Sequence, residues 1–163
     1  MYIGPVQTFL RGIEFLTLSL WLGGDVFLSF VLAPGAFSIL ESRDAAGIIV
    51  GYSLARLHIA GIFLGLLFLL ARLLRTHSFA SFTNAAALCV VLMMLLTAAS
   101  QFTVSNRMAR LRLQMVSVQN TPASDPLRVE FNRLHHISVA YEGAVQLLGF
   151  AGLFLLVRET ARP

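Results

Sequence analysis

Four ionisable side chains lie within or at the margins of long apolar stretches of this chain. They are Asp25, Arg56, His58 and Glu142. Charge is costly in lipid, so where it persists it usually faces the interior of a helix bundle and marks a pathway or a binding site. Imidazole and carboxylate together also suit zinc, copper or iron. The residue types therefore point to the binding or movement of a small solute or a metal ion.

The elements that must position these residues are four apolar stretches, each long enough to cross a hydrocarbon layer of about 30 Å as a helix. Hydrophobic residues make up 57% of the 163 residues and charged residues 12%, well below the roughly one quarter that is usual in soluble domains. We therefore predict an all-α, polytopic membrane four-helix bundle that forms a single domain over residues 1–163. The four stretches are residues 15–32, 48–70, 79–102 and 137–157.

All twelve basic residues are arginine, and they flank the apolar stretches instead of forming one patch. This distribution favours anchoring at the membrane interface over nucleic-acid binding. The run Arg107, Arg110 and Arg112 predicts contact with anionic lipid headgroups. The arginines divide almost evenly between the two sides, so membrane orientation stays open, as does the oligomeric state. The single cysteine, Cys89, lies in mid-span and forms no intrachain disulfide.

Helix boundaries follow from prolines and polar links. We expect a retained first helix over residues 5–32, which bends or stops at Pro34. Residues 76–78 predict a tight turn before a third helix that starts near residue 79 and continues, amphipathic, to residue 118. Asp125-Pro126 is typical of an N-cap and first helical residue. Helices 3 and 4 are thus expected to extend beyond the bilayer as a hairpin.

The depths of the polar residues coincide. A rise of about 1.5 Å per residue places Asp25, His58 and Glu142 roughly 20, 21 and 24 Å from the side that holds the termini. Polar residues on all four helices therefore occupy one half of the membrane, which predicts a shared polar cavity. The candidate cavity-lining residues are Trp21, Asp25, His58, Gln101, Asn106, His135, Ser138 and Glu142.

Helical phase supports the cavity. Glu142 shares a face of its helix with His135 and Ser138. His58 belongs to a stripe of small residues at 47, 51, 55, 61 and 65, which permits close helix packing in lipid. Arg56 lies about 160° away around the helix, so it is the better candidate to reach toward the interface. A structural Asp25–Arg56 ion pair and a simple interhelical hydrogen bond from His58 are the alternatives.

A metal or haem site is a second hypothesis. His58, His135 and Glu142 form the candidate ligand set for a transition metal, and His58 and His135 are the candidate axial ligands of a haem. The chain contains no compact ligand motif such as HExxH or CxxC. It also lacks the phosphate-binding glycine loop and the nucleophile elbow of conventional soluble enzymes.

Several short motifs are similar to those of one known family. These are Trp21-Leu22-Gly23-Gly24, Phe30-Val31-Leu32-Ala33-Pro34, Asn106-Arg107-Met108 and Phe131-x-x-x-His135-x-x-Ser138. With them, nearly the whole chain resembles the transmembrane protein 205 family of four-helix membrane proteins, which includes bacterial members.

The resemblance implies a membrane protein without an established reaction, in a family whose eukaryotic members are associated with resistance to platinum drugs. The family is distantly similar to copper-resistance D-like membrane proteins, some of whose relatives bind haem. By the matched motifs, the resemblance implies Trp21, Asn106, His135 and Ser138 as the leading candidate site residues. The chain departs from a copper protein in its shortage of thiolate and clustered methionine ligands.

The leading hypothesis is a non-enzymatic, multi-pass protein of the bacterial inner membrane that binds or moves a small solute or metal ion through a cavity between its helices. A haem- or metal-binding redox protein is the second hypothesis. A structural or assembly factor, whose polar cluster only fixes helix register, is the third.

Overall fold

The computed structural model describes residues 4–161, and within these residues the chain forms helices joined by loops. Four helical segments are long and apolar enough to cross a membrane, by length and composition. At about 1.5 Å per residue each is roughly 50 Å long, more than a bilayer core requires. The segments are Pro5–Ile39, Arg43–Thr76, Ala85–Met115 and Pro126–Ala161.

The first segment is continuous where a break was predicted. Helix α1 (Pro5–Phe27) passes through a π-helical turn, η1 (Leu28–Leu32), into α2 (Ala33–Ile39). Pro34 therefore lies in the first turn of α2, where a missing N–H is tolerated. The wider π turn shifts the backbone hydrogen-bond register just before the proline. Of the two expected outcomes, a bend or a stop at Pro34, the stop was wrong, because the π turn lets the helix continue through the proline.

Helix α3 (Arg43–Thr76) is a single uninterrupted element. The side chain of Ser42 caps its first turn by accepting a hydrogen bond from the Ala45 N–H at 3.2 Å. His77 ends it in the left-handed conformation, with φ of 51°. The predicted turn at residues 76–78 is confirmed.

The third segment begins later than predicted. Residues Phe79–Thr83 form a short 3-10 turn, η2, and α4 runs from Ala85 to Ala99, capped by Asn84. A second π-helical turn, η3 (Ser100–Ser105), leads into α5 (Asn106–Met115). The predicted start near residue 79 was wrong because the Asn84 side chain caps the N–H of Ala86 and fixes the helix start there.

Helix α6 (Pro126–Ala161) begins as the sequence predicted. The Asp125 carboxylate accepts a hydrogen bond from the Leu127 N–H at 2.8 Å, and Pro126 is the first helical residue. An N-cap carboxylate satisfies one of the free N–H groups of the first turn, which accounts for this boundary.

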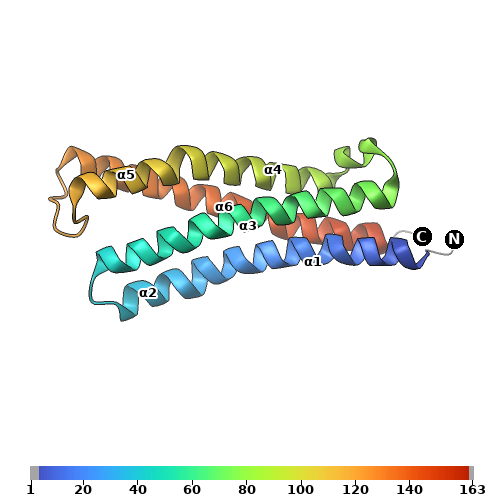
Figure 1. Cartoon of the computed structure of the whole chain (residues 1–163), viewed down its shortest axis with the longest axis horizontal. Helices are drawn as coiled ribbons and strands as arrows, with labels where there is room; N and C mark the ends of the chain where they lie inside the picture. The colour runs from blue at the N-terminus through green and yellow to red at the C-terminus, as the bar shows by residue number, and fades with distance from the viewer. Residues whose placement is uncertain (1–3, 162–163) are drawn as a thin grey trace.

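The four segments form an antiparallel ring, in which each packs on its sequence neighbours and α6 closes the ring against α1 (Figure 1). Both ends of the described chain lie at one end of the bundle, opposite the loop between α5 and α6. The larger hydrophobic core includes Trp21, Phe68, Met93 and Leu156, and a smaller one joins α5 to the start of α6 around Leu111 and Phe131. Buried side chains thus gather in two separate clusters along the bundle.

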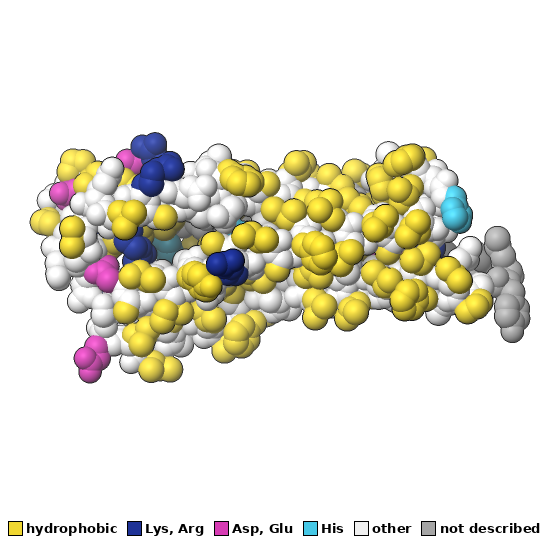
Figure 2. All heavy atoms as spheres, in the orientation of Figure 1, with side chains coloured by type: hydrophobic (Ala, Val, Ile, Leu, Met, Phe, Trp, Pro, Cys, Tyr) yellow, Lys and Arg dark blue, Asp and Glu magenta, His cyan; other side chains and the backbone are white. Residues whose placement is uncertain are grey.

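The outer surface of the bundle is apolar. Large hydrophobic side chains such as Leu147, Phe30 and Phe63 are more than half exposed. Figure 2 shows hydrophobic side chains over most of one face, with charged groups mainly at the end that holds the α5–α6 loop. Four such helices are consistent with an integral membrane protein that crosses the bilayer several times. The all-helical, four-span fold predicted from the sequence is confirmed.

Candidate functional site

His58 joins three of the four spans. Its Nδ1 lies 2.8 Å from Oε1 of Gln101 in η3, and its Nε2 lies 2.7 Å from Oε1 of Glu142 in α6. The His58 side chain is 2% exposed and that of Glu142 is 13% exposed. Both partners, as oriented, are hydrogen-bond acceptors, so an imidazolium that donates from both ring nitrogens satisfies the whole arrangement.

Asp25, in the first span, lies near the His58–Glu142 pair. It is 2% exposed and lies close enough to His58 and Glu142 to interact electrostatically with both. The Gln146 amide, one turn after Glu142, donates to the Asp25 backbone oxygen at 3.2 Å and to Ser29 Oγ at 2.6 Å. Within residues 4–161, the Oδ2 atom of Asp25 is buried without a hydrogen-bond partner.

A cavity of about 730 Å³ lies next to this cluster, which we call the acid–histidine cluster (Asp25, His58 and Glu142). Residues from all four spans line it, with walls such as Leu28, Phe37, Ile48 and Leu54 that are mainly apolar. Figure 2 shows a hollow on this face, toward the end with the α5–α6 loop, with basic and histidine side chains visible inside. The polar lining residues are Ser29, Gln101, Ser105, Asn106, Arg112, His135, Glu142 and Gln146.

The small-residue stripe of α3 serves two purposes. A Cβ on Gly65 would lie 3.0 Å from Cζ3 of Trp21, and a Cβ on Gly61 would collide with the same indole. Gly51 and Ala55, farther toward the start of α3, line the cavity instead, and a Cβ on Gly51 would meet nothing within 4 Å. The stripe therefore accommodates Trp21 at one end and opens onto the cavity at the other.

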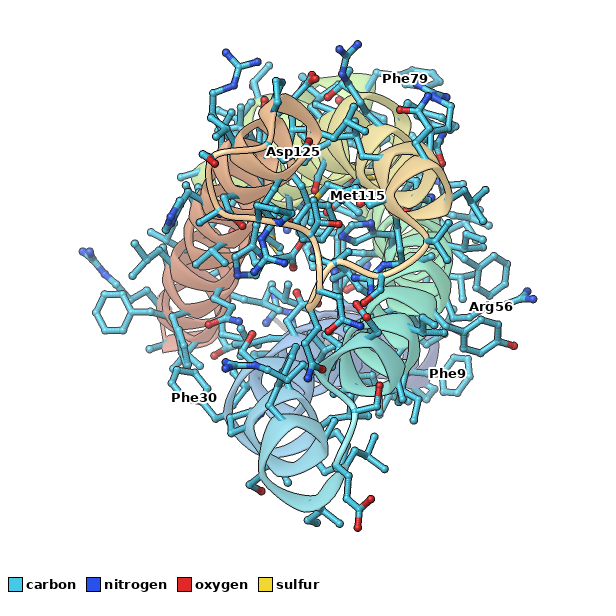
Figure 3. All side chains as sticks on the ribbon, turned by 90° about the vertical axis from the view of Figure 1, so that its left-hand side faces the viewer. Phe9, Phe30, Arg56, Phe79, Met115 and Asp125 are labelled. Carbon is cyan, nitrogen blue, oxygen red and sulfur yellow. The ribbon has the colours of Figure 1, made fainter. Side chains whose placement is uncertain are left out.

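Arg56 is separate from the site. Its side chain is exposed, with the guanidinium 5.1 Å from the centroid of the Tyr52 ring, and Figure 3 shows it pointing away from the bundle. No ion pair joins it to Asp25 in the part of the chain that the structure describes. The structural Asp25–Arg56 pair is therefore wrong, because Arg56 lies on the opposite face of α3 from His58.

The other sequence-predicted site residues divide between the cavity and the packed interior. Asn106 and His135 line the cavity. Trp21 and Ser138 are buried in the bundle and lie outside the cavity lining. Ser138 is thus brought near Glu142 by helical phase alone, without a place on the cavity wall.

The candidate metal ligands do not assemble as a set. His58 and Glu142 meet, whereas the His135 ring lies near that of its chain neighbour His136, tilted and with centroids 6.1 Å apart. Over residues 4–161, no group of three or more His, Cys, Asp or Glu side chains is placed to hold a metal ion. Both ring nitrogens of His58 have partners, so axial ligation of a haem would require the loss of one of them. The residues in this arrangement do not fit either group.

Two π-helical turns flank the acid–histidine cluster, and neither was predicted from the sequence. Gln101 lies in η3 and Ser29 lies in η1, and each hydrogen-bonds within or beside the cluster. In the described chain, the hydroxyls of Ser100 and Ser105 are buried and lack partners. Such turns occur frequently at functional sites. The Pro34 that follows η1 is the one sequence signal for either of them.

A second buried charge cluster, at the end of the bundle with the termini, was also missed. The Glu14 carboxylate is fully buried and accepts from Arg72 Nη1 at 3.1 Å and from Arg75 Nε at 2.6 Å. Arg72 also donates to Glu159 at 2.7 Å. This network ties α1, α3 and α6 together. The arginines were predicted to lie at the membrane interface, and nothing in the sequence pattern indicated that two of them pair with Glu14.

The loop between α5 and α6 crosses the other end of the bundle (Figure 3). Asp44, in the first turn of α3, holds it by accepting hydrogen bonds from Ser117 Oγ at 2.7 Å and from the Val118 N–H at 3.0 Å. Val116 precedes these bonds with a φ of 62°, which is rare for a β-branched residue. The contacts fix the loop beside Arg112, at the outer end of the cavity.

Comparison with known proteins gives one family. No curated protein and no solved structure matches the chain significantly. The model of a domain of unknown function, DUF4149, matches residues 16–117, which run from the middle of α1 to just beyond the end of α5. Asp25, His58 and Gln101 lie within the matched part, whereas Glu142 lies outside it. Because the match covers more than half of the sequence, the chain belongs to the DUF4149 family.

Proposed function

We propose that this protein is a non-enzymatic membrane protein that binds or moves a small solute or ion through the cavity between its helices. One observation carries the proposal: the buried His58–Glu142 pair, with the buried Asp25 of a third span within electrostatic reach, adjoins a cavity of about 730 Å³ that Glu142 helps to line. Cavities of this size accommodate small organic ligands. Ionisable side chains at such depth are expensive in lipid, which favours a functional reason for keeping three of them.

The finer features of the protein belong to the same proposal. We infer one domain over residues 1–163, location in the bacterial inner membrane, and membership of a wider group similar to the transmembrane protein 205 family. We also infer that α5 and the start of α6 extend beyond the bilayer as a hairpin. The small hydrophobic cluster between α5 and α6 supports the hairpin, since it gives this end a core of its own.

Three arginines, Arg107, Arg110 and Arg112, were predicted to contact anionic lipid headgroups, and we infer that one of them contributes most. Arg107 pairs with Glu130, and Arg112 lies against Asp44 and over the Phe131 ring. Arg110 is exposed and, among the residues that the structure describes, makes no ion pair. We therefore expect Arg110 to contribute most to contact with lipid phosphates.

Thiol accessibility tests whether the cavity admits water and solutes. Gly143 lines the cavity next to Glu142, and Gly23 lies at a similar depth near Asp25 but outside the lining. A Cβ on either glycine would meet nothing within 4 Å, so both accept cysteine. In a Cys89→Ser background, a charged, membrane-impermeant methanethiosulfonate should modify Gly143→Cys much faster than Gly23→Cys. Equal protection of the two cysteines would contradict the proposal.

A cellular test separates a functional cluster from one that only fixes helix register. We expect Glu142→Gln to change the tolerance of cells to toxic metal ions or drugs while protein abundance stays unchanged. Glu130→Gln, which removes a carboxylate paired with Arg107 on the surface, is the matched control. If every substitution in the cluster only lowers the amount of folded protein, the structural role is the better account.

A further inference from the structure

We propose that the cavity binds a lipophilic organic monocation, with the charged centre of the ligand at the acid–histidine cluster and its apolar body along the cavity walls. This inference rests on the proposed function and names the class of solute. Three features of the site support it, namely its charge balance, the distribution of polar groups along the cavity, and the shape of the space beside Glu142.

The first feature is an excess of carboxyl groups over basic partners. The cluster contains two carboxylates, and His58 neutralises at most one of them. Asp25 is 2% exposed, and its Oδ2 atom lacks a hydrogen-bond partner within residues 4–161. A buried carboxyl group without a counter-charge takes up a proton rather than staying ionised. A ligand with one positive charge would replace that proton as the counter-charge.

The second feature is that the cavity's basic residues lie away from this cluster. Arg112, toward the outer end, is 4.0 Å from the Asp44 carboxylate and 5.3 Å from the Phe131 ring centroid, so its charge already has partners. His135 precedes Glu142 by two helical turns, about 10 Å. The Arg112 guanidinium is thus already engaged, whereas a cation in the cavity would lie against the Glu142 carboxylate, the one member of the cluster that lines the wall.

The third feature is the apolar length of the cavity. Leu28, Phe37, Ile48 and Leu54 provide hydrophobic walls, and Ser29 and Gln146 add polar groups close to the cluster. A hydrated metal ion gains nothing from such walls, while an amphiphile buries its apolar body there. Gly143 leaves open space next to Glu142, since a Cβ at this position would meet nothing within 4 Å.

Two ions of the same shape and opposite charge test the ligand class. We would measure equilibrium binding of tetraphenylphosphonium and of tetraphenylborate to the full chain in lipid nanodiscs, with empty nanodiscs as the blank. The proposal predicts saturable binding of the cation, about tenfold tighter than any saturable binding of the anion. Equal binding of the two ions, or no saturable binding of the cation, would overturn it.

Variants then locate the binding site. Glu142→Gln should weaken cation binding about thirtyfold, as expected when one partner of a buried charge pair is lost. Asp25→Asn is the second variant, for use if Glu142→Gln does not fold. Gly143→Leu should weaken binding about tenfold by filling the cavity, while Gly23→Leu and Glu130→Gln should leave it unchanged. Unchanged binding in both Gly143→Leu and the folded carboxylate variant would also overturn the proposal.

The thiol experiment distinguishes the two proposals. If Gly143→Cys reacts with the charged reagent but no cation binds, the ligand class is wrong and the solute cavity stands. If Gly143→Cys is as protected as Gly23→Cys, both proposals fail.

Discussion

The Nε2 atom of His58 lies 2.7 Å from Oε1 of Glu142, although 84 residues separate the two in the chain. The pair connects the second span to the fourth, and the bond from His58 Nδ1 to Gln101 adds the third. Removal of one partner from such a pair leaves a buried polar group uncompensated.

A double-mutant cycle on His58→Ala and Glu142→Ala should show whether this pair is ionic. Neutral hydrogen bonds between membrane helices average about 0.6 kcal/mol and reach about 1.7 kcal/mol. Because an imidazolium satisfies both acceptors around His58, we expect a coupling free energy above that range, about 2–3 kcal/mol. Unfolding equilibria in bicelles measure it. The exposed Arg107–Glu130 pair is the control and should give about 0.2–1 kcal/mol. A His58–Glu142 coupling within the neutral range would contradict the expectation of an ionic pair.

Glu14→Gln should destabilise the end of the bundle that carries the termini. The substitution leaves Arg72 buried with only Glu159 as its counter-charge and removes the carboxylate that Arg75 contacts. We expect a loss of about 3 kcal/mol in the free energy of unfolding. Glu41→Gln, at an exposed position, should change it by no more than about 0.5 kcal/mol. Equal effects of the two substitutions would show that the buried network contributes little.

Gly61→Ala should be unfavourable because the added methyl group collides with the Trp21 indole. Overpacking of this kind costs about 1–3 kcal/mol. Gly51→Ala, on the same stripe, adds its methyl group in open space and should be neutral or stabilising by up to about 1 kcal/mol through helix propensity. Thermal unfolding in detergent compares the two variants. A Gly61→Ala variant more stable than Gly51→Ala would contradict the packing of Trp21 against α3.

Asp44→Asn should loosen the loop between α5 and α6. The carboxylate holds Ser117 Oγ and the backbone N–H groups of Val118 and Gln119, with bonds of 2.7, 3.0 and 3.3 Å. The asparagine amide presents one acceptor oxygen instead of two, so we expect faster amide hydrogen exchange at residues 117–121 and little change within α3. Glu41→Gln again serves as control. Unchanged exchange in Asp44→Asn would mean that the loop is held by other contacts.

The amino-acid sequence by itself determined the four apolar spans, the N-cap at Asp125, and the half of the bundle in which Asp25, His58 and Glu142 lie. Composition and a fixed rise per residue control these features, and both can be read along one chain. The small-residue stripe likewise showed which face of α3 packs inward. The two π-helical turns were not predicted, because almost nothing in a sequence indicates a shift of the backbone hydrogen-bond register.

Only the tertiary structure decided which side chains meet. It pairs His58 with Gln101 and Glu142, leaves Arg56 on the outer surface, and brings Glu14 to Arg72 and Arg75, 58 and 61 residues away. The physical reason is that depth and helical phase fix the position of a residue on its own helix. A contact between two helices also depends on how each helix is rotated and tilted relative to the other. Those rotations are set by packing at particular places, such as the Trp21 indole against Gly61 and Gly65.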